Sequence, residues 1–358
     1  MRARTHHLSQ VLRRLADDGP RSRAELARDL DVTKATASAL VADLLERDLV
    51  EERTTARTGV AGRPGTDVAL SGRRVAGLGL EIDADHVAAA VVDLTGAVRS
   101  CVRHEHDNRS ASGRRVLDRL HDAATEALDG FDVVGATLAV PGLVDAGTRT
   151  LHVAPNLHWF DADLDRVATD LELPLVVDNE ANLAAIAEHR FGAGRGRRSF
   201  VHVSGGIGVG AGMVVDGELA RGAHGFGGEI GHLVVDPNGK RCACGARGCL
   251  ETIAGRDRRA SRVAVANALA TALRSVVHLL DPDAIILGGT FVAHGEQLTS
   301  AIADHLAATT LGGRWHPCEV LPSQLGVDAA VIGAAAVALD PIFADPELVP
   351  TRPWKATA

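Results

Sequence analysis

The chain has 358 residues, of which 46% are hydrophobic and 23% are charged. This balance is typical of folded globular proteins and excludes an extensively disordered chain, and the length predicts two or three domains. The formal net charge is −8, but residues 1–70 hold 12 Lys and Arg against 11 Asp and Glu. The overall charge therefore does not decide whether the N-terminal part binds nucleic acid.

No uninterrupted apolar run reaches the roughly 18 to 20 residues of a membrane span. Residues 1–10 are polar and lack the apolar core of a signal peptide. We therefore expect a cytoplasmic protein with no membrane partner. Five cysteines are present, and three of them lie within residues 242–249. In a reducing compartment this clustering indicates a metal site rather than a disulfide framework.

Residues 1–72 have the pattern of a winged helix-turn-helix domain. The first of three short helices has a face of aliphatic residues at helical spacing, namely Leu8, Val11, Leu12 and Leu15. Ser22 and Glu25 have the spacing of a capping box at the start of the second helix. The third helix is expected to turn four residues inward, namely Ala39, Leu40, Leu44 and Leu45. Two strands, 49–52 and 66–70, would then enclose the polar loop of the wing.

The third helix and the wing are the expected DNA-binding surface. In a helix-turn-helix the N-terminal residues of the third helix reach base edges in the major groove. This geometry assigns DNA contacts to Thr33, Lys34, Thr36 and Ser38, although a solvated helix face would have the same composition. Arg53 in the wing and Arg63 in Gly62-Arg63-Pro64 are expected to add contacts, the latter in a narrow minor groove. The weak basic charge favours a homodimer that binds two operator half-sites.

From residue 73 onward, strands and helices alternate, which is the pattern of an α/β domain. The expected strands include 78–82, 86–94, 96–103, 133–140, 175–177, 200–203 and 284–287. The expected helices are 164–171, 181–191, 263–280 and 328–339. Two similar halves, each opening with hairpin strands, predict a duplicated fold with two lobes. We expect an effector domain over 73–345 and a C-terminal tail over 346–358.

The most specific chemical pattern is His232 followed by Cys242, Cys244 and Cys249. One imidazole and three thiolates make a closed tetrahedral set, which suits structural zinc rather than a catalytic metal with an open position. Glycines between the cysteines allow the loop to fold tightly enough for the sulfur atoms to converge. The alternative is a group of buried or reactive cysteines without metal.

The same segment resembles the signature of the ROK family, which groups repressors, open reading frames and sugar kinases. The resemblance rests on Gly228-Glu-Ile-Gly-His232 and on the run from Cys242 to Glu251. Further matches follow the family order over residues 75–340, namely Val140–Val144, Pro155–Leu157 with Trp159, Asp178–Asn182 and Ile285–Gly289. The resemblance implies a two-lobed, actin-like and ribonuclease H-like duplicated fold of the sugar-kinase type, assembled as a dimer or tetramer.

The resemblance also implies a sugar pocket. Glu229, His232 and Glu251 occupy positions that bind sugar hydroxyls in the family, and His232 also binds zinc. Asn156 and Asn179 match the pocket asparagines, Gly142 lies in the pocket wall, and Glu180 stands where the kinases have their catalytic aspartate. Carboxylates and amides are chemically suited to this role, because they satisfy the donors and acceptors of a sugar.

The kinase parts of the family pattern are altered. The phosphate-binding D-x-G-x-T is replaced by Glu81-Ile-Asp83-Ala-Asp85, where carboxylates would repel phosphate. The second phosphate loop has Gly205 in place of a threonine, and Glu180 carries one methylene more than the catalytic aspartate. We therefore expect no enzyme activity and no ATP.

These observations favour a sugar-responsive transcriptional repressor of carbohydrate uptake or catabolism genes, with operator DNA and a small sugar as partners. Two alternatives stay open. One is an active ATP-dependent sugar kinase with an accessory DNA-binding domain, and the other is an adaptor that responds to a partner protein. Neither the sugar, the operator sequence nor the direction of the response can be read from the sequence.

Overall fold

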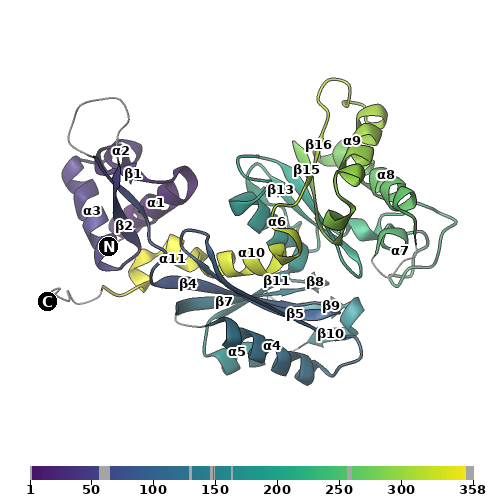
Figure 1. Ribbon diagram of the computed structural model, residues 1–358, viewed down its shortest axis with the longest axis horizontal. Helices are drawn as coiled ribbons and strands as arrows, with labels where there is room; N and C mark the ends of the chain where they lie inside the picture. The colour runs from purple at the N-terminus through teal and green to yellow at the C-terminus, as the bar shows by residue number, and fades with distance from the viewer. Residues whose placement is uncertain are drawn as a thin grey trace.

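The computed structural model describes residues 2–55, 65–128, 131–145, 148, 150–162, 164–255 and 260–351. It comprises an N-terminal winged helix and two lobes, each built on one five-stranded sheet (Figure 1). The predicted combination of a winged helix-turn-helix with a duplicated α/β domain is confirmed.

The winged helix follows the predicted pattern. Its elements are α1 (Arg2–Asp18), β1 (Arg21–Ser22), α2 (Arg23–Asp29), α3 (Lys34–Glu46), β2 (Val50–Thr55) and β3 (Gly65–Leu70), with β3 between β1 and β2 in the sheet. The four aliphatic residues expected inside the first helix are buried. Ser22 and Glu25 form the predicted capping box, with the Ser22 hydroxyl accepting from the Glu25 N–H at 3.3 Å. The two-residue strand β1 is not indicated by the sequence, because it is too short for a periodic signal.

The buried face of α3 differs from the prediction at two alanines. Ala37 is buried, whereas Ala39 is exposed. The buried positions Ala37, Val41 and Leu44 follow the spacing of one helical face, on which Ala39 does not lie. Either alanine fits the hydrophobic pattern by composition, so only packing against the other helices decides between them.

The first lobe has a sheet with the order β11-β7-β4-β5-β6. Its strands are β4 (Val75–Ile82), β5 (His86–Asp93), β6 (Val98–Glu105), β7 (Asp132–Val140) and β11 (Leu175–Asn179). The strands β4, β5 and β6 pair in antiparallel fashion, and β7 and β11 extend the sheet in parallel with β4. One face is covered by α4 (Gly113–Ala127), against which α5 (Asp165–Leu171) packs (Figure 1).

The second lobe repeats this arrangement. Its sheet order is β14-β13-β12-β15-β16, formed by β12 (Phe200–Gly205), β13 (Val209–Val215), β14 (Glu218–Leu219), β15 (Ala284–Gly289) and β16 (Glu319–Pro322). Again three strands pair in antiparallel fashion and two follow in parallel with the first. Its outer helices are α7 (Glu251–Ala254), α8 (Arg262–Leu280) and α9 (Glu296–Thr309). The predicted duplication is therefore present strand for strand.

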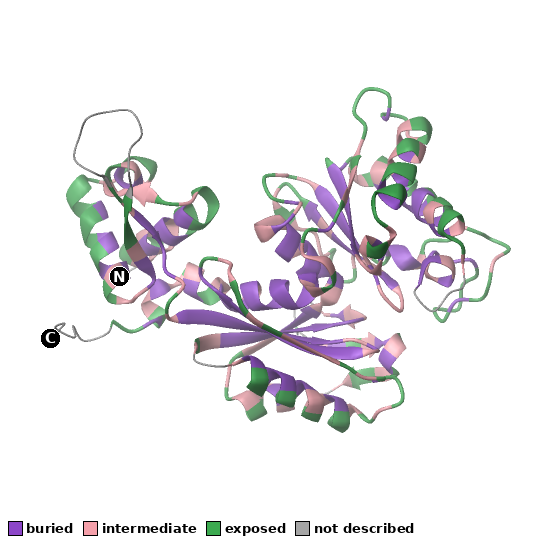
Figure 2. Cartoon of the chain, viewed as in Figure 1, coloured by how far each residue is buried: buried purple, intermediate pink, exposed green. Residues whose placement is uncertain are grey.

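Two helices join the lobes. The helix α6 (Glu180–Phe191) packs on β12 and β13 of the second lobe, and α10 (Ala329–Ala338) packs on β4, β5 and β7 of the first. They also pack against each other, and α10 is buried almost throughout (Figure 2). Glycines allow this approach, because a Cβ on Gly333 would lie 1.9 Å from the Leu183 carbonyl oxygen and one on Gly79 would lie 2.0 Å from that of Val331.

A third, small sheet lies beside the carboxyl end of β7. It has the order β10-β9-β8 and consists of β8 (Leu143–Val144), β9 (Leu151–Ala154) and β10 (Trp159–Ala162). Between β9 and β10 the chain makes the short 3-10 helix η1 (Pro155–Leu157). This sheet is not predicted from the sequence, but it carries the Pro155–Leu157 match to the family pattern.

Two segments, 262–280 and 326–344, have the length and hydropathy of a membrane span. No membrane span is expected from the sequence, because neither segment is an uninterrupted apolar run. The first segment is α8, which packs against α7 and α9, and the second contains the buried helix α10. Core helices of globular domains meet the same criteria, so these segments are weak evidence for a membrane.

The winged helix shares a hydrophobic core with the C-terminal end of the chain. The helix α11 (Asp340–Ala344) and the turn η5 (Pro346–Leu348) follow α10 and lie against α1 (Figure 1). Ile342 and Val349 are buried in the same cluster as Leu8 and Leu12. The Ser9 hydroxyl donates to the Phe343 carbonyl at 2.6 Å. The first residues of the expected tail, 346–351, are thus packed against the winged helix, and residues 352–358 lie outside the described part.

We predict that Gly333→Ala lowers the free energy of unfolding by about 1–3 kcal/mol. Alanine is intrinsically favoured over glycine in a helix by about 1 kcal/mol, but here its methyl group would overlap the backbone of α6. The measurement is chemical denaturation of both proteins. Gly312→Ala is the matched control, because a Cβ there meets nothing within 4 Å, and an equal loss in both variants would contradict the packing argument.

Candidate functional site

The candidate metal ligands lie on two segments of the second lobe. His232 ends the 3-10 helix η2 (Ile230–His232), and the cysteines lie on the loop that leads into α7. A bridge between Val234 and Cys249 holds these segments together, and one between Arg241 and Arg247 closes the cysteine loop on itself. Gly248 has φ of 70°, and a Cβ there would lie 1.5 Å from the Asp236 carbonyl oxygen. Only glycine therefore permits this loop to close.

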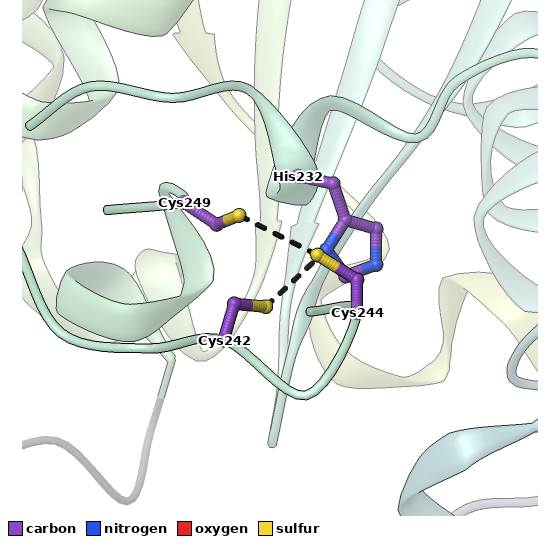
Figure 3. Close-up of side chains that lie close together, drawn as sticks. All are labelled: His232, Cys242, Cys244 and Cys249. Carbon is purple, nitrogen blue, oxygen red and sulfur yellow. Dashed lines mark hydrogen bonds between the residues drawn. The ribbon is translucent and has the colours of Figure 1, made fainter. Parts of the chain in front are cut away.

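The four ligand atoms converge (Figure 3). All lie within 4.8 Å of one another. The Cys244 and Cys249 sulfur atoms are 3.7 Å apart, and the Cys242 sulfur lies 3.6 Å from His232 Nδ1. A tetrahedral ion with Zn–S bonds of about 2.3 Å and Zn–N bonds of about 2.0–2.1 Å requires separations of roughly 3.8 and 3.6 Å. The residues therefore fit a tetrahedral metal ion with Nδ1 as the imidazole ligand.

Without a metal, two of the thiols in this loop hold their protons tightly. Burial raises the pKa of the Cys242 thiol, and its hydrogen bond to Glu251 raises it further. Burial likewise raises the pKa of Cys249. Thiols of this kind stay protonated at neutral pH unless a metal replaces their protons. The Cys242 sulfur donates to Glu251 Oε1 at 2.8 Å, so the metal loop and Glu251 are directly linked.

The expected sugar-binding residues come from both lobes. Asn156 lies on η1 of the first lobe, and Glu251 begins α7 of the second. Both reach the loop after β12, because a Cβ on Gly208 would lie 3.2 Å from Glu251 Oε2 and 3.3 Å from Asn156 Nδ2. Glu229 Oε2 is 3.8 Å from His232 Nε2, and Glu251 Oε1 is 3.7 Å from His232 Nδ1. His232 thus lies between the two glutamates.

The other side of the expected sugar site is formed by three residues, Asn179, Glu180 and Gly142. Asn179 is the N-cap of α6, and its side-chain oxygen accepts from the N–H groups of Ala181 and Asn182. Its amide nitrogen donates to the Gly142 carbonyl at 3.0 Å and to Glu180 Oε2 at 2.8 Å. Gly142 has φ of 109°, and a Cβ there would lie 2.0 Å from the Val153 carbonyl oxygen. The three residues are therefore held in contact.

Carboxylates surround Glu180. Desolvation raises the pKa of Glu180 well above its ordinary value, and the negative charges of Asp83, Glu229 and Glu81 raise it further. Asp83 lies at the turn between β4 and β5, and a Cβ on Gly206 would lie 3.7 Å from its Oδ2. The two loops that correspond to the phosphate loops of the kinases thus face each other with acidic groups between them.

One residue beside this group has no role assigned from the sequence. Asp178 accepts from the Asn179 N–H at 2.8 Å and forms an ion pair with Arg221, which follows β14 in the second lobe. The pair joins the lobes next to Asn179. In the sequence, Asp178 belongs to the Asp178–Asn182 match with the family pattern, but nothing there points to Arg221, which is 43 residues away.

On the winged helix, the expected DNA contacts at the start of α3 are exposed. Lys34, Thr36 and Ser38 all face solvent. Thr33 is the N-cap of α3, and its hydroxyl accepts from the Thr36 N–H at 3.1 Å. Arg53 lies on β2 and pairs with Glu51 at 2.8 Å. Arg63 lies outside the described residues.

Comparison with protein families gives two matches. The model described as "ROK family" matches residues 77–257 and 257–341, and the model described as "MarR family" matches residues 9–59. The first covers both lobes, and the second covers the C-terminal part of α1, all of α2 and α3, and the strand β2.

Similar proteins include both regulators and kinases. The xylose repressor of Bacillus spizizenii is 26% identical, over 92% of this chain and 94% of the repressor. A solved ROK family glucokinase of Streptomyces griseus, in complex with glucose and AMPPNP, is 28% identical with a TM-score of 0.68, over 74% of this chain and 99% of the kinase. A solved ROK family transcriptional regulator, described as a homolog of the E. coli MLC protein, has a TM-score of 0.75 at 22% identity, over 95% and 96% of the two chains, and shows the fold.

We predict that Cys249→Ser abolishes stoichiometric zinc binding and lowers the melting temperature, because a hydroxyl is a poor replacement for a thiolate ligand. Metal content after dialysis is the measurement. Cys101→Ser is the matched control, because Cys101 is exposed and lies outside the metal loop. Unchanged zinc content in Cys249→Ser would exclude the four-ligand site.

We also predict that Glu180→Gln stabilises the protein increasingly from about pH 5 to pH 8. Because the pKa of Glu180 is raised in the folded state, folding favours its protonated form, and stability falls as pH rises above the ordinary value of 4.5. Glutamine mimics the protonated form and removes this loss. Thermal melts at several pH values measure the difference between the proteins.

Glu188→Gln is the control for this experiment, because it makes the same substitution in the same helix. Glu188 accepts hydrogen bonds from the Leu325 N–H at 3.2 Å and the Ala193 N–H at 2.7 Å. Its replacement should destabilise the protein at every pH tested. A pH-independent effect of Glu180→Gln would contradict the proton uptake.

Proposed function

The chain belongs to the ROK family, and from this membership we propose that it is a sugar-responsive repressor of transcription. One observation carries the proposal: a winged helix shares a continuous hydrophobic core with a domain of sugar-kinase fold. The similarity to the xylose repressor also extends over the winged helix, whereas the glucokinase similarity covers only three quarters of the chain. The genes that it regulates would encode carbohydrate uptake or catabolism.

The DNA partner is an operator read by α3. Lys34, Thr36 and Ser38 are exposed at the N-terminal end of this helix, which is the end that approaches base edges in helix-turn-helix proteins. Thr33 caps the helix and can present its methyl group or backbone to DNA, and Arg53 and Arg63 add contacts from the wing. A homodimer would place two such helices on the two halves of an operator.

The effector is a small sugar that binds between Asn156 and Asn179 of the first lobe and Glu229, His232 and Glu251 of the second. Gly142 and Glu180 complete this group. Support comes from the contacts that bring Asn156 and Glu251 to Gly208, and from the hydrogen bonds of Asn179 to Gly142 and Glu180. Paired carboxylates and amides bind hydroxyl groups and leave unpaired polar atoms when a ligand lacks them.

The metal ion would be structural zinc held by His232, Cys242, Cys244 and Cys249. The three cysteines would bind the ion as thiolates, and this coordination would fix the loop that carries His232 and leads into Glu251. With the ion in place, Cys242 no longer donates to Glu251, so this carboxylate becomes available to a sugar. We place the winged helix at 1–72, the effector domain at 73–345 and the tail at 346–358, in a cytoplasmic protein.

Loss of kinase activity is part of the proposal. Asp83 and Glu81 add negative charge beside Glu180, which already has a raised pKa. A nucleoside triphosphate bound beside Glu180 would meet carboxylates where the kinases of the family have a glycine and a threonine. The alternative, an active sugar kinase, is favoured by the similarity to the glucokinase in complex with glucose and AMPPNP.

Two variants test the two halves of the proposed function separately. The operator is first selected from random duplex DNA, and its affinity is then measured by fluorescence anisotropy with and without D-xylose or D-glucose. Lys34→Ala should lower operator affinity about tenfold and leave sugar binding unchanged. Glu229→Gln should lower sugar affinity at least tenfold and leave DNA binding unchanged.

Lys240→Ala and Glu218→Gln are matched controls, because both residues are exposed and lie outside these surfaces. Failure to select any DNA sequence would remove the repressor assignment. Sugar-dependent ADP production from ATP and Mg²⁺, above that of Glu229→Gln, would instead establish the kinase.

A further inference from the structure

A large cavity lies away from the proposed sugar site, where the winged helix meets both lobes. Its volume is about 690 Å³, which lies in the range of small-molecule sites, and such sites are frequent at domain interfaces. The winged helix contributes α1 and the strands β2 and β3, the first lobe contributes the turn after β5, and the second contributes the loop at Arg195 and Gly217. None of the proposed sugar-binding residues lines it.

The charged groups of this cavity leave a surplus of arginine. Asp93 accepts from the N–H and hydroxyl of Thr95, from the Ala97 N–H, and from Arg99. Asp340 pairs with Arg190 at 2.9 Å. The carboxylates of these two aspartates are therefore satisfied by the protein itself.

Of the other three arginines in the lining, Arg53 pairs with Glu51 at 2.8 Å, so the guanidinium groups of Arg13 and Arg195 remain. Both residues line the cavity and are exposed, and neither has an acidic partner among the residues that the structure describes. Arg13 lies on α1, whereas Arg195 lies in the loop after α6, so the two come from different domains. Asp17 is the remaining acidic residue of the lining, and its carboxylate has no basic partner among the described residues.

The rest of the lining is largely apolar. Apolar side chains come from all three parts of the molecule, namely Leu15, Leu70, Leu94, Phe191, Leu339 and Phe343. His189 also lines the cavity, but its Nδ1 is buried away from the cavity surface. A ligand with an apolar body would cover the first group, and its oxyanion would satisfy the arginines.

We propose that this cavity is a second ligand site, which takes a small organic oxyanion, a phosphate or a carboxylate on a partly apolar body. Such a ligand would touch the winged helix and both lobes at once. It would therefore bind most tightly to one arrangement of the winged helix and the two lobes. This difference in binding free energy would favour one orientation of α3.

Calorimetric titration of the full-length protein tests the site. Phenyl phosphate and benzoate are the anionic probes, benzyl alcohol is the neutral probe, and inorganic phosphate lacks the apolar body. We expect at least one anionic probe to bind tenfold or more tightly than benzyl alcohol and inorganic phosphate. Binding of phenyl phosphate alone would identify a phosphate site, and binding of benzoate alone a carboxylate site.

Variants then locate the bound probe. Arg13→Ala combined with Arg195→Ala should weaken binding at least tenfold, whereas Arg14→Ala combined with Arg198→Ala should not. These controls are neighbouring arginines that pair with Asp18 and Asp216 and do not line the cavity. Ala16→Trp places a bulky side chain in the cavity without changing its charge and should also weaken binding.

The site is independent of the proposed sugar pocket, so Glu229→Gln should bind the probe as tightly as the unchanged protein. Loss of probe binding in Glu229→Gln with no effect of the arginine pair would place the probe in the sugar pocket and overturn the proposal. Absence of binding by both anionic probes would overturn it as well.

Discussion

The close crossing of α10 with α6 and β4 determines how the parts of this molecule are arranged. Gly333 and Gly79 bring backbone against backbone, so no side chain separates the helix that packs on the first lobe from the helix that packs on the second. Asn179 caps one end of α6 and holds Gly142 and Glu180, while α10 continues into α11 and its contact with α1. The proposed effector site and the winged helix are therefore attached to the same pair of helices.

Electrostatics then restricts what the site between the lobes can accept. Glu81, Asp83 and Glu229 all act on Glu180, and Glu229 itself has a pKa raised by burial and by the charge of Glu251. A further anion there would add repulsion in a poorly solvated place, whereas neutral hydroxyl groups can donate to these carboxylates. The acidic residues Glu81 and Asp83 thus disfavour a phosphate group at this place and remain compatible with a sugar.

Much of the fold can be predicted because its signals are local. Buried strands such as β4 and β5 are continuous apolar runs, and the Ser22–Glu25 capping box marks the start of a helix by sequence alone. The helix α4 is not among the expected helices, although its buried residues Val116, Leu120, Ala123, Ala124 and Ala127 follow helical spacing. In α3, packing rather than composition buries Ala37 and leaves Ala39 exposed.

The candidate site likewise has a part that can be predicted from the sequence and a part that cannot. The candidate metal ligands can be predicted from the sequence because three cysteines lie within one short loop and His232 precedes them by ten residues. The ion pair of Asp178 with Arg221, the approach of Asn156 to Glu251, and the cavity at Arg13 and Arg195 cannot be found, because each joins segments that are distant in the chain. Such contacts depend on how the lobes and the winged helix pack, and no local pattern records this packing.

Coupling between a sugar and DNA needs a contact that differs between two arrangements of the molecule. The helix α6 is the element best placed to supply it. Its first turn holds Asn179 and Glu180 beside the proposed sugar site, and His189, Arg190 and Phe191 at its other end line the cavity under the winged helix. A shift of the second lobe about α10 would move both ends together, because α6 packs on β12 and β13. The cavity would then change shape when the lobes close, and α1, which forms one of its walls, would be displaced with the rest of the winged helix.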